Sequence, residues 1–131
     1  MSERKVTSFA IAINVADLDR SADFYTRLIG MTELTRHDAP GMRESILQTE
    51  GSGGPNLLLV RADGPAEPPE IGTGLSRLAA FVPDLQSVCA RLRADDFEVS
   101  DPMHVDGDVT VAFVRDPDGF PIELIEANVS S

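Results

Sequence analysis

Residues 10–18 read AIAINVADL, and residues 77–85 read RLAAFVPDL. Both stretches alternate like a strand with one apolar face, and both end in Asp-Leu. Asp17 and Asp84 occupy equivalent places, 67 positions apart, and each is suited to cap a helix that follows the strand. The sequence therefore predicts two copies of a strand followed by a helix.

The two expected helices carry apolar residues at helical spacing. These residues are Leu18, Ala22, Tyr25, Leu28 and Ile29 in the first copy, and Leu85, Val88, Cys89 and Leu92 in the second. Gly30 is a suitable end for the first helix, and the second is expected to end near Asp95 and Asp96. Cys89 is the only cysteine, so no intramolecular disulfide is expected. On an apolar helix face it is expected to act as a small hydrophobe.

The second halves of the two copies also match. Residues 45–62 align without a gap on residues 110–127, at an offset of 65, and each segment reads as strand, turn and strand. The expected turns are GSGGP at 51–55 and DPDGFP at 116–121. These segments add two strands to each copy.

Less regular strands near 32–36 and 97–100 complete each set, so each copy is expected to be βαβββ. Residues 63–76 contain three prolines and three glycines, which predicts a linker. The expected organisation is one domain over residues 1–131, with module one at about 7–62 and module two at about 77–127. Each half has too few strands to bury its own sheet, so we expect the halves to lie side by side around a shared cleft.

Composition excludes several classes of function. The net charge of −11 and the pI near 4.4 argue against nucleic-acid and anionic-membrane partners, which need a basic face. No stretch approaches 18 apolar residues and Met1–Thr7 lacks a hydrophobic signal region, so a cytoplasmic location is expected. Fingerprints of acyl hydrolases, P-loop proteins and dinucleotide enzymes are missing from the sequence.

Three local patterns carry a family resemblance. They are VADLDRSADFY at 15–25 followed by LIGM at 28–31, VPDL at 82–85, and DPDGFPIEL at 116–124. Together they resemble the glyoxalase/bleomycin-resistance/dioxygenase (vicinal oxygen chelate) superfamily. The resemblance implies an α+β fold in which two tandem βαβββ modules form an open eight-stranded half-barrel with a ligand in its cleft. It also implies a homodimer.

Metal-dependent members of this superfamily bind a divalent ion through four side chains drawn from His, Glu or Gln. The equivalent positions here are Ala10, Leu58, Arg77 and Glu123. The two aliphatic side chains have no lone pairs, and a guanidinium has no acceptor. Because only Glu123 is able to coordinate, the sequence predicts neither a metal nor another cofactor at this site.

Arg77 and Glu123 are expected to project into the same cleft. One interpretation is an ion pair that only neutralises two buried charges. The other is an anchor for a ligand oxygen. In a catalytic version, Glu123 is the base and Arg77 stabilises an oxyanion.

Six further residues are candidates to contact a small-molecule ligand: His37, Met42, Gln48, Met103, His104 and Phe113. The histidines are expected in loops that rim the cleft, where a surface role is the alternative; a His104–Glu123 acid–base pair is one interpretation. The methionines flank the same rims and also suit ordinary packing. Gln48 and Phe113 are equivalent in the repeat, but a period of two does not tell which face points inward.

Two functions follow. The first is a metal-independent binder that sequesters a drug or metabolite, as in the bleomycin-resistance branch. The chain has no tryptophan and one tyrosine, so stacking on a planar drug depends on its six phenylalanines. The second is an enzyme, a glyoxalase-like lyase or isomerase or a relative of the dioxygenases. The sequence leaves open whether the protein is an enzyme.

Overall fold

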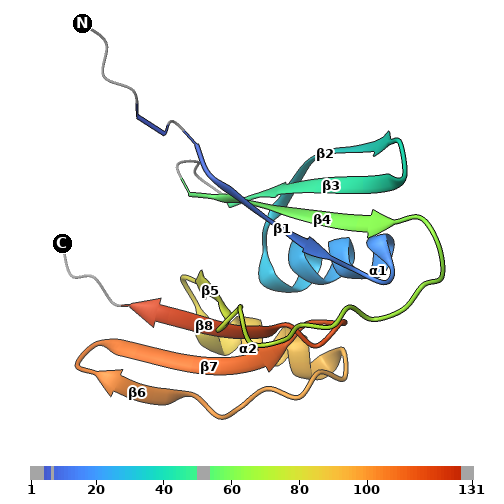
Figure 1. Ribbon diagram of the computed structural model, residues 1–131. Coiled ribbons are helices and arrows are strands. Elements are labelled where there is room, and N and C mark those ends of the chain that lie inside the picture. Colours follow the sequence, from blue (N-terminus) through green and yellow to red (C-terminus); the bar gives the residue numbers. More distant parts are fainter. Residues whose placement is uncertain (1–4, 7, 50–53, 128–131) are drawn as a thin grey trace, which may run out of the picture. The chain divides into compact units, whose positions relative to one another are not determined.

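The computed structural model describes residues 5–6, 8–49 and 54–127. The chain forms two compact units, Met1–Pro69 (unit 1) and Glu70–Ser131 (unit 2), which are drawn in Figure 1. Unit 1 contains β1 (Ala10–Asn14), α1 (Leu18–Asp23), η1 (Phe24–Ile29), β2 (Thr32–Ala39), β3 (Met42–Gln48) and β4 (Asn56–Ala62). Unit 2 contains β5 (Leu78–Phe81), α2 (Leu85–Ala94), β6 (Met103–Asp106), β7 (Val109–Arg115) and β8 (Pro121–Ala127).

Each unit contains one four-stranded mixed sheet with the same topology. The strand orders are β1-β4-β3-β2 and β5-β8-β7-β6. The first strand of each module pairs in parallel with the last, and the other neighbours are antiparallel. The predicted α+β fold with two βαβββ modules is confirmed. The closure of the two sheets around one cleft and the domain boundaries stay predictions.

The helical segment of unit 1 has the predicted extent. The Asp17 carboxylate accepts a hydrogen bond from the backbone N–H of Arg20, which caps α1. The second half, η1, is π-helical, and it ends at Gly30, whose φ of +105° is favourable for glycine. None of the helices in the described residues combines the length and the hydropathy that a membrane span needs.

Each sheet has one face covered by its own helix and one face without a helix, here called the helix-free face. Helix α1 packs on β3 and β4, and α2 packs on β7 and β8. The side chains beneath the helices are buried, among them Leu47, Leu59, Ala112 and Leu124. Because successive strand residues alternate, their neighbours Leu58 and Glu123 lie on the helix-free faces.

The prediction that His37 and His104 lie in loops was wrong, because both lie within strands. His37 lies on β2 and His104 on β6. Gly41, with a φ of +81°, and Gly107, with a φ of +51°, allow tight turns between β2 and β3 and between β6 and β7. The strands therefore extend further toward the turns than their polar composition suggests.

The predicted strand near 97–100 is also corrected. Val99 forms only an isolated antiparallel bridge with Val114, and the fourth strand of unit 2 is β6 instead. Pro102 has no backbone N–H, so the ladder to β7 breaks before β6 begins. The turn predicted at 51–55 lies mostly outside the described residues.

The cap of α2 makes the stability of unit 2 depend on pH. The hydroxyl and backbone N–H of Ser87 donate to the Asp84 carboxylate and hold its pKa below the ordinary value of 3.8. A lowered folded-state pKa gives stability that is complete above pH 3.8 and is lost as the pH falls through the folded pKa. We expect Asp84→Ala to lower the thermal midpoint at pH 7, with a smaller difference from the wild type in acid.

Asp84→Asn is the matched control, because asparagine is also a good N-cap and does not titrate. Thermal unfolding followed by circular dichroism checks the prediction. If the thermal midpoint of Asp84→Ala stays below that of the wild type by the same amount down to pH 2, the charge of Asp84 does not contribute to the cap of α2.

Candidate functional site

The centre of the candidate site is a contact between Arg77 and Glu123 in unit 2. Nε of Arg77 donates to Oε1 of Glu123 at 2.8 Å. The side chain of Glu123 is 15% exposed, whereas that of Arg77 is 50% exposed. The sequence-based expectation that these two residues lie together is met within this unit. A half-exposed cation beside a mostly covered carboxylate is able to receive a ligand.

The parallel pairing of β5 with β8 sets this contact. Ala79 pairs with Glu123, and Leu78 pairs with Ile122, so Arg77 emerges just before the start of β5. Strand alternation turns Arg77 and Glu123 to the same side, the helix-free face. The geometry comes from the rigid ladder rather than from a loop.

A tight turn sets the start of β8. The buried Asp116 carboxylate accepts hydrogen bonds from the backbone N–H groups of Asp118 and Phe120, each at 2.9 Å. Gly119 has a φ of +96°, which favours glycine at this position. These bonds join β7 to β8 in the register that turns Glu123 away from α2.

Both partners retain unused hydrogen-bonding capacity. Nη1 of Arg77 donates to Oγ of Ser76 at 3.1 Å. Among the described residues, no side chain or backbone group binds Nη2 of Arg77 or Oε2 of Glu123. The site therefore offers an N–H donor edge and a free carboxylate oxygen on one face of the sheet.

The side chains at the family's ligand positions do not fit a metal ion. In unit 1 these positions are Ala10 and Leu58, which offer only methyl and isobutyl groups. In unit 2 the guanidinium of Arg77 repels a cation and has no lone pair to donate. Within residues 5–6, 8–49 and 54–127, no three His, Cys, Asp or Glu side chains gather in a way that suits a metal.

Three of the predicted ligand-binding residues lie on the helix-free face of unit 1, spread along β2 and β3. His37 pairs with Glu44 across β2 and β3, and its Nε2 lies 3.2 Å from Oε1 of Glu44. Met42 and Gln48 follow the same alternation along β3. Unit 1 thus carries its own acid–base pair on this face.

In unit 2, Phe113 and Met103 share the helix-free face with Glu123, but His104 does not. Phe113 pairs directly with Glu123, and Met103 pairs with Val111. His104 pairs with Thr110, and Nδ1 of His104 lies 3.1 Å from Oγ1 of Thr110 on the side of the sheet that carries α2. The structure does not bring His104 and Glu123 together as an acid–base pair.

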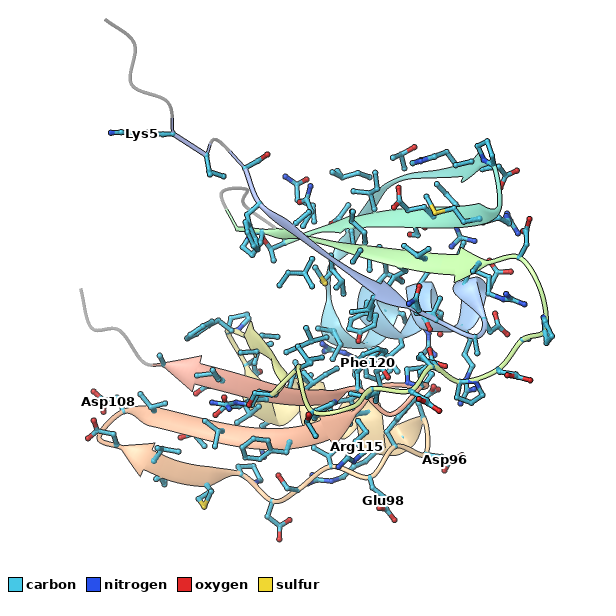
Figure 2. All side chains as sticks on the ribbon, viewed as in Figure 1. Lys5, Asp96, Glu98, Asp108, Arg115 and Phe120 are labelled. Carbon is cyan, nitrogen blue, oxygen red and sulfur yellow. The ribbon has the colours of Figure 1, made fainter. Side chains whose placement is uncertain are left out.

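A hollow of about 1020 Å³ borders this site at Phe113. It lies at the end of β7 where Figure 2 shows Arg115, Asp96 and Glu98. Nη1 of Arg115 donates to the carbonyl oxygen of Gly119 at 3.0 Å, so part of this guanidinium stabilises the turn. Neither member of the Arg77–Glu123 contact lines the hollow.

Sequence reasoning missed Ser76, Glu44 and Phe81. Residues 77, 79 and 81 lie on the same face of a strand, because side chains alternate. This alternation was the signal that places Phe81 on the helix-free face together with Arg77. Glu44 became visible only once His37 lay on a strand opposite it. No pattern pointed to Ser76, which precedes the strand.

The buried thiol of Cys89 does not contribute to this site. Burial on the inner face of α2 raises its pKa, so the reactive thiolate is disfavoured. This agrees with the expected role of Cys89 as a small hydrophobe on the apolar face of the helix.

Several proteins with similar sequences or structures carry enzyme names. A probable lactoylglutathione lyase of Synechocystis sp. is 33% identical over 122 residues, which cover 88% of this chain and 92% of the relative. The trypanothione-dependent glyoxalase I of Leishmania major superposes with a TM-score of 0.78 at 30% identity, covering 93% of this chain and 87% of that one. A maize glyoxalase I variant gives a TM-score of 0.76 at 28% identity; the match covers 87% of this chain but only 42% of the maize chain.

These relatives correct the first functional interpretation. We expected a metal-independent binder that sequesters a drug or metabolite, because the ligand residues are replaced at Ala10, Leu58 and Arg77. The similar curated proteins are lactoylglutathione lyases, and they match nearly the whole chain. The drug-sequestering interpretation was therefore wrong, and the enzymatic alternative is better supported.

The matched segment includes both modules and the Arg77–Glu123 contact. A sequence model of the family matches residues 8–124, from before β1 to the middle of β8. The three motifs, the doubled βαβββ topology and this match agree with one another. The chain belongs to the Glyoxalase/Bleomycin resistance protein/Dioxygenase superfamily.

Proposed function

We propose that this protein is a glyoxalase-type lyase or isomerase that moves a proton at the carbon next to a carbonyl group. Glu123 is the base, and Arg77 stabilises the oxyanion that forms. The observation that carries the proposal is the 2.8 Å contact between these side chains on an open sheet face. The names of the relatives support it, because a lactoyl group is a 2-hydroxyacyl group with such a carbon.

The free atoms of the pair divide the two tasks. A substrate carbonyl oxygen accepts hydrogen bonds from Nη2 of Arg77, while Oε2 of Glu123 receives the proton from the adjacent carbon. Negative charge then develops on the oxygen beside a permanently protonated guanidinium. Return of the proton to the same carbon gives exchange alone. In isomerisation the proton goes to the neighbouring carbon, and the hydroxyl proton passes to the oxygen of the former carbonyl, so the step needs no oxidant or reductant.

The contact between the two residues also keeps them in place. The bond from Nε to Oε1 fixes the carboxylate relative to the guanidinium, so Oε2 and Nη2 face the ligand together. Because the side chains at the four family positions do not fit a metal, this mechanism assigns the electrostatic task to Arg77. A small 2-hydroxycarbonyl compound is the proposed substrate class.

Removal of the guanidinium tests the role of Arg77. We expect Arg77→Met to slow proton transfer about 100-fold, because the oxyanion loses its donor. The readout is deuterium uptake from D2O, measured by NMR, at the carbon beside the carbonyl of S-lactoylglutathione and of 2-hydroxyacetophenone. Arg77→Lys is expected to recover only part of the rate, because lysine lacks the planar fork.

Arg43→Met is the matched control. Arg43 is similarly exposed and also holds one carboxylate, that of Asp38, at 2.9 Å. Its loss is expected to leave the exchange rate within about twofold of the wild type. Equal rates in Arg77→Met and Arg43→Met contradict the role given to Arg77.

Two features suggested by the sequence and the resemblance stay predictions: a cytoplasmic location and a homodimer. Light scattering coupled to size exclusion tests the dimer directly.

A further inference from the structure

We infer that the substrate is an uncharged 2-hydroxycarbonyl compound with an aromatic or branched apolar substituent, rather than an anionic conjugate. This inference rests on the proposed function and names the substrate class of the same site. It follows from what surrounds the Arg77–Glu123 pair on the helix-free face of unit 2.

The first observation is a group of exposed apolar side chains on this face. Phe81 is 75% exposed, Met103 is 56% exposed and Phe113 is 41% exposed. Large apolar side chains left in water on one side of a sheet are a feature of binding surfaces. Here all three share the face with the proposed base.

The second observation is the order of these residues across the sheet. Glu123 lies between Ala79 and Phe113, and the next row on the same face contains Phe81, Ile125, Val111 and Met103. Two residues along a strand correspond to about 7 Å. A ligand whose reacting carbon lies at Glu123 therefore meets Phe113 in the same row and further apolar side chains about 7 Å along the strands, the length of a phenyl or branched alkyl substituent.

The third observation is that the cation beside the proposed base has an acid as its partner. Arg77 contacts Glu123. Because the carboxylate of Glu123 offsets the charge of the guanidinium, the pair presents no net positive charge to a carboxylate.

The charge of the whole chain favours the same class. At −11, the protein repels anions at long range. A glutathione conjugate carries two carboxylates and one ammonium group, so it approaches with a net negative charge. An uncharged ligand avoids this repulsion and gains from burial of the phenylalanines.

The test compares two compounds in binding and in turnover. 2-Hydroxyacetophenone is the uncharged apolar probe, and S-lactoylglutathione is the anionic one. We expect ligand-observed NMR titrations to show at least about tenfold tighter binding of 2-hydroxyacetophenone. Phe113→Ala and Phe81→Ala are each expected to weaken that binding about tenfold and to leave S-lactoylglutathione unaffected.

Phe9→Ala is the control, because Phe9 is an exposed phenylalanine of unit 1. Far-UV circular dichroism verifies that the exposed-site variants fold. Tighter binding of S-lactoylglutathione, or no effect of either unit 2 variant, overturns the inference. Deuterium uptake separates the two ideas: selective binding of 2-hydroxyacetophenone without exchange in either compound supports this site but contradicts the proposed function.

Discussion

Replacement of Glu123 by glutamine is expected to slow deuterium exchange about 100- to 10,000-fold. The amide keeps the shape of the side chain and still accepts a hydrogen bond from Nε of Arg77, but it cannot take a proton. Binding of 2-hydroxyacetophenone is expected to change less than about threefold, because Nη2 of Arg77 and the apolar face remain. Exchange kinetics and NMR titrations measure the two effects separately.

Glu126→Gln is the matched control for this variant. Glu126 lies on the same strand, and its Oε1 accepts a hydrogen bond from the backbone N–H of Leu85 at the start of α2. A glutamine oxygen is able to accept the same bond, so little change is expected. If Glu123→Gln exchanges deuterium as fast as Glu126→Gln, Glu123 is not the base.

Loss of a core leucine from either sheet is expected to lower the free energy of unfolding by about 2–5 kcal/mol. Leu59 and Leu124 occupy equivalent places in the two modules, 65 positions apart, and each is 0% exposed. The alanine variants lose buried contacts and leave cavities beneath α1 and α2. Urea unfolding followed by circular dichroism measures the change.

Leu34→Ala provides the control for these variants. Leu34 is 51% exposed, so the same chemical change is expected to cost less than about 1 kcal/mol. The packing described above is contradicted if Leu59→Ala or Leu124→Ala lowers the free energy of unfolding no more than Leu34→Ala does.

The doubled topology was predictable because both modules repeat the same pattern of strands. Asp17 and Asp84 mark the two helix starts, and both caps are formed in the structure. The helix-free faces were not predictable, since a period of two defines two faces and the packing of the helices selects between them. That selection places Phe113 beside Glu123 and His104 on the other side of the sheet.

The errors in the strands came from turns and from proline. Gly41 and Gly107 were present as turn signals, yet the polar residues around His37 and His104 were interpreted as loops. Positive φ at these glycines allows short turns, so the neighbouring polar residues belong to the strands. Beyond residues 97–100, the hydrogen-bond ladder to β7 breaks at Pro102. The pattern of apolar residues does not reveal this break.

The functional error had a different origin. The metal ligands of the family are replaced at Ala10 and Leu58. These replacements limit the mechanism that the site is able to use, but we interpreted them as evidence against any catalysis. The relatives that match nearly the whole chain are named as lyases, and Arg77 and Glu123 remain in contact on an open face. The site that lacks ligands for a metal still holds a carboxylate and a guanidinium in contact.

The central claim is that Arg77 and Glu123 transfer a proton without a metal. The most direct test is the rate of deuterium uptake by S-lactoylglutathione and 2-hydroxyacetophenone after the protein has been stripped with a chelator and its metal content measured. We predict that at least one compound exchanges at the same rate before and after stripping, and that this exchange is lost in Glu123→Gln. Exchange that disappears on stripping and returns with added zinc or nickel contradicts the account.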